Sequence, residues 1–473
     1  MSRSQSKEML SATDDGGITT NGAAADGAGH HHVEPKQVHA TLARHMLADG
    51  FDLVLDLEKS QGAYLYDSAS GKRYLDFFTF FASNPVGMNH PKLNNEEFIR
   101  KIGHVAIHKP SSSDIYTVEM AEFVDTFFRV AVPEYFKYGF FIEGGALAVE
   151  NALKVAFDWK VQKNFHKGYK KECGHLVLHF RHAFHGRSGY TLSLTNTDPN
   201  KTNYFPKFPN WPRVDPPSAK FPLDGDNLSD TIRREEATIA DIRQAFIDNP
   251  DQIACIILEP IQGEGGDNHF RAEFLQALRD ICDEFEALLI FDEVQTGVGL
   301  TGHMWAHQAI GVRPDIISFG KKSQVCGILA TDRVDDVQNN VFHKSSRINS
   351  TWGGNLVDMV RFQRFLEIIE EEGLVENAAT VGKHLIGELE RLRSDFPAMV
   401  SNVRGLGLMC AMDLPTAQER DLFRQKCYDK GLMILGCGDR SIRFRPPLNL
   451  TAGQVDEGME IIREAIEEII KEY

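Results

Sequence analysis

The segment that decides the fold begins LLIFDEVQ at Leu288–Gln295 and ends DIISFGKK at Asp315–Lys322. Each motif contains a short apolar run followed at once by charged residues, which is typical of a buried strand that ends in a loop. The spacing between Asp292 and Lys321 leaves room for one helix and one strand. Strands that alternate with helices in this way predict a mostly parallel sheet covered on both faces.

The same alternation extends outward in both directions. Apolar runs predict strands at residues 138–142, 176–180, 253–259, 288–293 and 316–319. Amphipathic stretches predict helices at residues 146–162, 271–284, 358–371 and 375–393. Residues 62–78 predict two short strands joined by a turn at Ser70-Gly71, and residues 200–225 predict a long surface excursion. We therefore expect an α/β fold, with a smaller domain of helices and short strands from about residue 355.

The composition excludes several classes of partner. The formal net charge of −16 gives no counterion-release affinity for nucleic acid and repels an anionic membrane. No apolar run approaches the roughly 20 residues that span a bilayer. The 7 cysteines are odd in number and form no C-x-x-C pair, which argues against a disulfide framework or zinc site and favours the reducing cytoplasm. Composition leaves open whether the acidic balance is an adaptation to salt.

Residues 1–33 are small and polar, and they predict a disordered tail. The run His30–His32 could bind a metal, although a solvated tail is the favoured interpretation. This N-terminal stretch lacks the apolar core of a signal peptide.

Lys321 directly follows an apolar strand and Gly320. The carboxyl ends of strands are where open α/β sheets bind ligands. A desolvated ammonium there has a lowered pKa and can act as an amine nucleophile. Taken alone, a lysine after a strand is more often a solvated loop residue.

Asp292 ends the other strand of the deciding segment. An acid in this position usually caps a helix or binds a metal. In a pyridoxal 5′-phosphate (PLP) enzyme, a carboxylate keeps the pyridine nitrogen protonated and makes the ring an electron sink. Gln295 could then bond the phenolic oxygen of the ring.

Two glycine-containing segments carry further candidates. In the first, Gly145 and Ala146 open a helical run after a strand, which predicts an anion site at a helix N-terminus, unless the turn is only structural. In the second, Phe184 could stack on a ring and Arg187 could bind a carboxylate. The alternative for the second segment is a core phenylalanine and a surface arginine.

Two more segments place charges near strands. The turn EPIQGEGG exposes Glu264, and the run SIRFRPP alternates Arg443 and Arg445 on one face of a predicted strand. These arginines could point into a cleft. A surface loop and a solvated basic face are the simpler interpretations.

Five motifs occur together in one order. They are FHGR at 184–187, EPIQGE at 259–264, DEVQTG at 292–297, DIISFGK at 315–321 and TWGGN at 351–355. From about residue 60 to the C-terminus the chain resembles the class III (omega) aminotransferases of PLP fold type I. The resemblance implies a large PLP-binding domain at 86–350 with a mostly parallel seven-stranded sheet flanked by helices. It also implies a smaller α+β domain formed by segments 34–85 and 351–473.

Three departures from the wider family pattern narrow the resemblance. The phosphate loop reads EGGALAVENALK, Leu300 stands where relatives usually carry arginine, and KSQVCG follows Lys321. All three resemble the members of the family that act on the ε-amino group of L-lysine with 2-oxoglutarate as acceptor. The resemblance implies a cytoplasmic homodimer with shared active sites, no metal, and neither nucleic acid nor membrane as a partner.

The resemblance also assigns roles to matching positions. Lys321 corresponds to the Schiff-base lysine and proton shuttle, and Asp292 and Gln295 correspond to the two partners of the pyridine ring. The remaining cofactor contacts implied are Gly145, Ala146, Phe184 and Thr351, the last donated by the neighbouring subunit. The implied substrate contacts are Arg187, Glu264, Asn349 and Arg443, with Glu264 and Arg443 as a gate pair.

Other functions remain open at this point. A class III enzyme acting on ornithine, acetylornithine, 4-aminobutyrate or a diamine is the nearest alternative. An aminomutase or racemase would turn over on the same fold without an oxo-acid acceptor. A non-catalytic binding protein would keep the fold without binding PLP.

Overall fold

A computed structural model describes residues 32–472 of the protein, which divide into two compact parts at Val54. The first part contains a 3-10 turn, η1 (Pro35–Gln37), and the short helix α1 (Val38–Ala43). Nearly all of the predicted tail at 1–33 lies outside the described residues, and so do His30 and His31. The prediction of disorder there stays a prediction.

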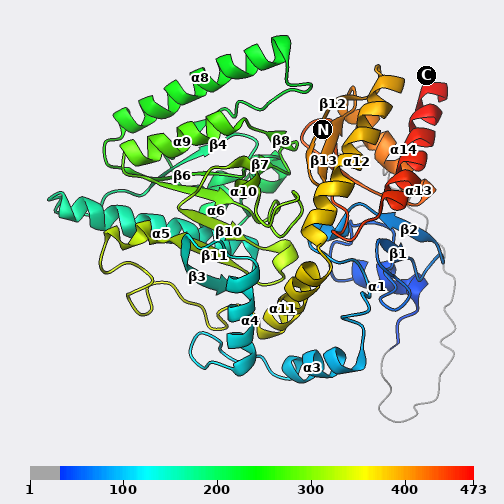
Figure 1. The fold of residues 1–473 in the computed structure, drawn as a ribbon, viewed down its shortest axis with the longest axis horizontal. Coiled ribbons are helices and arrows are strands. Elements are labelled where there is room, and N and C mark those ends of the chain that lie inside the picture. Colours follow the sequence, from blue (N-terminus) through cyan, green and yellow to red (C-terminus); the bar gives the residue numbers. More distant parts are fainter. Residues whose placement is uncertain (1–31, 473) are drawn as a thin grey trace, which may run out of the picture. The chain divides into compact units, whose positions relative to one another are not determined.

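The second part is built on a seven-stranded sheet in the order β3-β11-β10-β9-β6-β4-β5 (Figure 1). Its strands are β3 (Phe136–Ile142), β4 (Leu176–Phe180), β5 (Arg213–Val214), β6 (Ile253–Leu258), β9 (Leu288–Asp292), β10 (Ile316–Phe319) and β11 (Cys326–Thr331). All neighbouring pairs are parallel except those that β11 makes with β3 and β10. The mostly parallel, seven-stranded sheet expected from the sequence is confirmed.

Helices cover both faces because alternate residues of each strand point to opposite sides. In β9, Leu288 and Ile290 pack with α5 (Gly145–His166), whereas Leu289 and Phe291 belong to the core that contains α9 (Ala272–Glu284). The core that contains Leu289 and Phe291 also includes residues of α4 (Val118–Val130) and α11 (Leu356–Glu371). Burial on both faces explains why these strands read as continuous apolar runs.

Two smaller sheets lie outside the seven-stranded one, and the second of them joins segments from both ends of the chain. One is antiparallel, β12 (Ser401–Leu406), β13 (Met409–Asp413), β16 (Ser441–Phe444) and β15 (Leu435–Cys437). The other contains β1 (Tyr64–Tyr66), β2 (Arg73–Asp76) and β14 (Leu432–Met433). Because β14 pairs with β2, the N-terminal segment and the C-terminal third share a sheet. Helices α12 (Leu374–Asp395), α13 (Ala417–Lys430) and α14 (Ala452–Glu472) accompany them.

The predicted elements differ from the observed ones mainly at strand ends. β6 stops before Glu259 and β9 before Glu293, because both carboxylates turn to accept backbone N–H groups from the following loops. The sequence patterns missed β11 and the long helix α8 (Gly225–Asp248). The predicted excursion at 200–225 contributes the edge strand β5. The domain boundaries given above stay a prediction. Among the described residues, no helix combines the length and apolar character needed to cross a membrane.

Candidate functional site

Lys321 lies just beyond the carboxyl end of β10, at the start of a single 3-10 turn, η2 (Lys321–Ser323). Its φ of +55° is a left-handed conformation that is uncommon for any residue but glycine, and such strain is concentrated at functional sites. Burial, and next the Arg443 guanidinium, lower the pKa of Lys321 to about 8. This amine therefore loses its proton far more readily than an ordinary lysine.

The neighbouring Lys322 is held differently. Its Nζ donates to the Gln295 carbonyl oxygen at 2.8 Å and to the Ala82 carbonyl oxygen at 3.4 Å. Burial lowers the pKa of Lys322 far below its ordinary value. Lys322 is thus fixed to the backbone, whereas Lys321 forms no side-chain hydrogen bond within residues 32–472.

Asp292 ends β9 and is the register partner of Ser318 on the adjacent strand β10. One carboxylate oxygen faces the His185 Nδ1 at 2.7 Å, and the other accepts from the Val294 N–H and the Ser318 hydroxyl at 3.1 Å. Burial opposes the charged form of His185, but the Asp292 hydrogen bond and charge outweigh it and raise the His185 pKa. Asp292 and Lys321 therefore meet at the carboxyl ends of neighbouring parallel strands.

Glu259 is a site residue to which the sequence analysis gave no role. It follows β6, and its two carboxylate oxygens accept the backbone N–H groups of Phe184 and Gly263, each at 3.0 Å. Burial raises the pKa of Glu259 to about 7. Glu259 thus fastens the Phe184 loop to the next strand. Its position at a strand end, like that of Asp292, was the signal that could have revealed it.

Arg443 lies on β16 with only 3% of its side chain exposed. Its Nη2 donates to Glu264 Oε2 at 2.6 Å, so the predicted pair forms. Glu264 Oε1 is also 2.6 Å from Lys201 Nζ, a contact that the sequence gave no reason to expect. Burial favours the neutral carboxyl, but Arg443 and Lys201 together lower the pKa of Glu264.

Arg445 is fully buried and forms an ion pair with Asp267. Its Nε donates to Gln295 Oε1 at 3.0 Å, and Arg443 Nη1 approaches the same oxygen at 3.5 Å. The two arginines therefore share one face, as predicted, and the alternative of a solvated basic face is wrong. Because Gln295 Oε1 accepts from both, the NH₂ group of Gln295 remains available as a donor.

The N-terminus of α5 adjoins two of these loops. Gly144 precedes the helix with a φ of +98°, and Gly145 and Ala146 are its first residues. A Cβ built on Gly145 would lie 3.1 Å from Val294, and one built on Gly186 would lie 2.5 Å from Ala146. The N–H groups in the first turn of a helix have no partner within the helix, so this end of α5 suits an anion.

The remaining predicted residues are exposed. The Arg187 guanidinium has no ion pair within the described part of the chain. The Asn349 side chain accepts from the Ser350 N–H, and the Ser111 hydroxyl donates to the Thr351 carbonyl oxygen. Within residues 32–472 no contact joins Asn349 or Thr351 to the group around Lys321. The structure thus brings together Lys321, Asp292, Gln295, Glu264 and Arg443.

The donor set fits PLP. A readily deprotonated lysine, a carboxylate held by a histidine, an available amide donor and a helix N-terminus match the aldehyde, the ring nitrogen, the phenolic oxygen and the phosphate, respectively. The chain also matches the family described as "Aminotransferase class-III" over residues 47–466. The chain belongs to the class III aminotransferases. It is accordingly a PLP-dependent transaminase.

Several known proteins are similar in sequence to this class III aminotransferase over most of its length. "L-lysine-epsilon aminotransferase" of Mycobacterium tuberculosis is 53% identical over 433 residues, covering 91% of this chain and 96% of that protein. The protein of the same name from Amycolatopsis lactamdurans is 49% identical and covers 91% and 95%. Mouse mitochondrial 4-aminobutyrate aminotransferase is 31% identical and covers 85% and 82%.

Solved structures agree on the fold. A structure described as lysine aminotransferase from M. tuberculosis in the internal aldimine form superimposes with a TM-score of 0.90 at 52% identity, covering 92% of this chain and all of that one. An omega transaminase from Pseudomonas jessenii gives a TM-score of 0.78 at 22% identity, covering 91% and 98%. The large and small sheets of this aminotransferase therefore have the arrangement of PLP fold type I.

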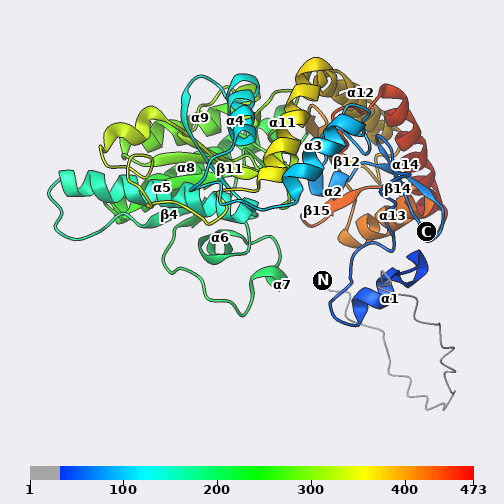
Figure 2. The same ribbon diagram turned by 90° about the horizontal axis from the view of Figure 1, so that it is seen from below.

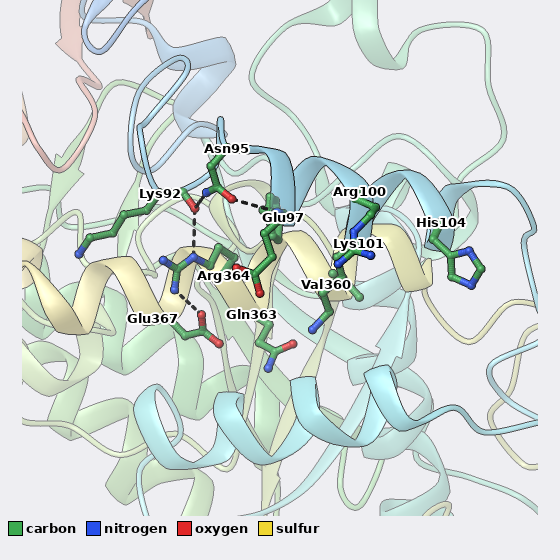
Figure 3. Close-up of a pocket in the computed structure, with 11 residues that line it drawn as sticks. Lys92, Asn95, Glu97, Arg100, Lys101, His104, Val360, Gln363, Arg364 and Glu367 are labelled. Carbon is green, nitrogen blue, oxygen red and sulfur yellow. Dashed lines mark hydrogen bonds and ion pairs between the residues drawn. The ribbon is translucent and has the colours of Figure 1, made fainter.

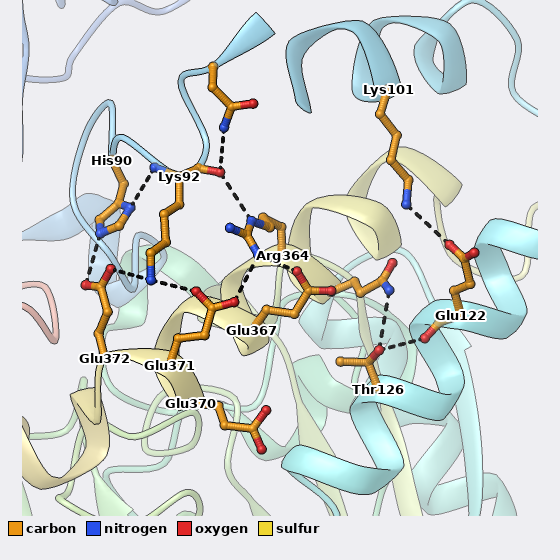
Figure 4. A network of polar contacts seen from close by, with 12 residues as sticks. His90, Lys92, Lys101, Glu122, Thr126, Arg364, Glu367, Glu370, Glu371 and Glu372 are labelled. Carbon is orange, nitrogen blue, oxygen red and sulfur yellow. Dashed lines mark hydrogen bonds and ion pairs between the residues drawn. The ribbon is translucent and has the colours of Figure 1, made fainter. Parts of the chain in front are cut away.

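A hollow of about 720 Å³ lies elsewhere in the aminotransferase, between α3 (Glu96–Ala106) and α11 (Figure 3). Lys92 and Arg364 supply charges there. Lys92 Nζ is 2.6 Å from Glu371, and Arg364 Nη1 is 2.6 Å from Glu367. Figure 4 shows these pairs as one continuous network along α11. Lys92 and Arg364 therefore already have acidic partners, unlike Lys321, for which the described residues provide no ion pair.

Proposed function

We propose that this transaminase is an L-lysine 6-aminotransferase. It moves the ε-amino group of L-lysine to 2-oxoglutarate and yields L-glutamate and 2-aminoadipate 6-semialdehyde, which cyclises to a piperideine carboxylate. The names of its relatives at 47–53% identity support the donor. The observation that carries the proposal is the Glu264–Arg443 pair, because it neutralises a buried cation that would otherwise attract the α-carboxylate of an amino acid.

The donor presents two ends of different polarity. With Arg443 neutralised, the exposed Arg187 is the group that binds the α-carboxylate of lysine. The ε-amine then points toward the Lys321 end of the cleft. Asn349, two residues before Thr351 and like it supplied by the neighbouring subunit, adds a polar contact to the substrate.

PLP, when bound, supplies the electron sink that stabilises negative charge on the substrate carbon. Gly145 and Ala146 hold its phosphate at the N-terminus of α5, together with Thr351 from the neighbouring subunit of a homodimer. Phe184 covers the ring face, and Gln295 donates to the phenolic oxygen. Asp292, fixed by His185, keeps positive charge on the ring nitrogen.

Lys321 is the proposed covalent anchor and proton carrier. Its pKa of about 8 leaves a useful fraction of free amine near neutral pH. The free Lys321 Nζ would remove the proton from the ε-carbon of bound L-lysine.

The acceptor half-reaction needs a second cation. 2-Oxoglutarate carries two carboxylates, so Arg443 must separate from Glu264 and bind one of them while Arg187 binds the other. We place the reaction in the cytoplasm, with no nucleic acid or membrane partner.

The test is turnover of purified enzyme with L-lysine and 2-oxoglutarate, followed by detection of glutamate and the cyclised product. Ornithine, acetylornithine, 4-aminobutyrate and a diamine serve as competing donors under the same conditions. A higher kcat/KM for any of them would remove the lysine assignment. Turnover without an oxo acid would indicate an aminomutase instead.

A variant separates the gate from general damage. Glu264→Ala should impair the lysine half-reaction more than the glutamate half-reaction, because the bare Arg443 then attracts the wrong carboxylate. Single-turnover rates of the two halves measure this. Equal losses in both halves would remove the gate role.

A further inference from the structure

Glu264 is held by two cations, of which only one belongs to the expected gate. Arg443 Nη2 meets one carboxylate oxygen and Lys201 Nζ meets the other, both at 2.6 Å. Lys201 comes from the four-residue helix α7 (Pro199–Thr202), within the excursion that follows α6 (Gly189–Leu194) (Figure 2). Residues distant in sequence therefore converge on a single carboxylate.

The two cations differ in their access to water. The Arg443 side chain is 3% exposed, whereas those of Lys201 and Glu264 are 27% and 26% exposed. Lys201 Nζ also lies 5.6 Å from the centre of the Phe184 ring, which is a favourable distance for a cation above an aromatic face. Lys201 therefore stands on the open side of Glu264, and Arg443 on the buried side.

This arrangement bears on how the pair can open. A carboxylate that leaves Arg443 with no other partner would lose its charge-assisted hydrogen bonds in a partly desolvated place. Glu264 already has an ion pair on its other oxygen, so it can leave Arg443 while keeping Lys201. Lys201 thus lowers the free-energy cost of separating Glu264 from Arg443, without itself contacting Arg443.

We propose that Lys201 is a specificity-determining residue that retains the Glu264 carboxylate whenever Arg443 turns to a carboxylate of the oxo-acid acceptor. The proposal rests on the gate in the proposed function and extends it to a third residue. Lys201 acts through Glu264, so it is a positioning residue. Its role belongs to the acceptor half-reaction, because only that half needs Arg443 free.

The fold of the excursion does not depend on this lysine. Asp198 caps α7 by accepting the Asn200 N–H at 2.9 Å, and Lys207 Nζ donates to the Thr202 carbonyl oxygen at 2.7 Å. Lys201→Met removes the charge and keeps the length of the side chain. Lys207→Met, in the same loop, is the matched control for general loosening.

The experiment measures the acceptor half alone, starting from holoenzyme in the pyridoxamine 5′-phosphate form and varying 2-oxoglutarate. In Lys201→Met the half-saturating concentration should rise on the order of 10-fold, since one charge-assisted contact no longer supports the open state. The lysine half should change by less than about 3-fold, because Glu264 stays paired with Arg443 throughout that half. Lys201→Arg should restore the acceptor half, and Lys207→Met should leave both halves near wild type.

A double-variant cycle decides whether Lys201 acts through Glu264. In a Glu264→Ala background, Lys201→Met should have no further effect on 2-oxoglutarate. A full effect in that background would mean that Lys201 binds the acceptor itself, and equal losses in both halves would mean a structural role. Either result overturns the proposal.

The outcome is separable from the donor assignment. A wild type that reacts with 2-oxoglutarate but not with lysine overturns the proposed donor and leaves the Lys201 result valid. A wild type in the pyridoxamine form that does not react with 2-oxoglutarate overturns both.

Discussion

Two regions of this aminotransferase each gather acidic and basic side chains, but they differ in how deeply those side chains are buried. Around Lys321, charges are buried, and Arg443 and His185 each keep a buried nitrogen without a hydrogen-bond partner in the described chain. Along α11, Lys92 and Glu371 are 35% and 44% exposed. In the first region, burial and neighbouring charges shift the pKa values of the side chains strongly. In the second region, the charged side chains mainly pair with one another.

The comparison shows that the volume of a hollow does not indicate where the reactive side chains of this protein lie. The space beside α11 has a volume of about 720 Å³, yet its Lys92–Glu371 and Arg364–Glu367 pairs are partly exposed, where such pairs contribute little. The strand-end cluster holds the Lys321 amine, the carboxylates of Asp292, Glu259 and Glu264, and the guanidinium groups of Arg443 and Arg445 in a partly desolvated place. Perturbed ionisation together with unpaired buried atoms marks the reactive region.

The sharpest way to break the comparison is Lys321→Ala. It should remove the visible band of lysine-bound cofactor and reduce turnover on the order of 1,000-fold or more, because both the anchor and the proton carrier are lost. Spectra and single-turnover rates measure this. Lys92→Met is the control variant and should keep the visible cofactor band and the turnover rate of the wild type. A Lys321→Ala enzyme that kept both as well would refute the role assigned to Lys321.

Asp292→Asn tests the carboxylate that His185 holds. It should lower kcat/KM in both half-reactions on the order of 100-fold, since the neutral amide cannot stabilise positive charge on the ring nitrogen. Steady-state kinetics with each amino donor measure the loss. A change of less than about 2-fold would show that this buried pair is only structural.

The pH dependence of cofactor attachment sharpens the contrast in pKa. Only the free amine of Lys321 reacts, so the rate on apoenzyme should rise about 10-fold per pH unit below pH 8 and level off above it. Burial is the main cause of the low pKa, and the Arg443 charge adds to it. Arg443→Met should therefore raise the pKa and move the profile to higher pH. A profile that stays in place would exclude that coupling.

The smallest effect is expected beside α11. Arg364→Met removes contacts with Glu367 and the Lys92 carbonyl oxygen. Because these groups are partly exposed, the free energy of unfolding should fall by about 1 kcal/mol or less, and turnover should not change. Denaturant unfolding and the lysine assay measure both. A large loss of turnover would mean that the hollow takes part in function.

Much of this protein was determined by its sequence. Apolar runs located β4 and β10 to the residue, because strands buried on both faces leave a continuous signal. Motif order identified the family and singled out Lys321 over Lys322. β11 was missed because its run follows directly on the lysine loop, and α8 because its pattern is mostly polar.

Only the tertiary structure revealed that Lys201 joins the Glu264–Arg443 pair. These three residues come from separated segments, and ion pairs between distant segments leave no local pattern in a sequence. Likewise, Asp292 and Glu293 are adjacent acids at the end of β9. The fold turned one toward His185 and used the other to receive the N–H groups of Ala306 and His307. Local periodicity fixes strands and helices, whereas the ionisation of a side chain depends on burial and neighbours that exist only once the chain has folded.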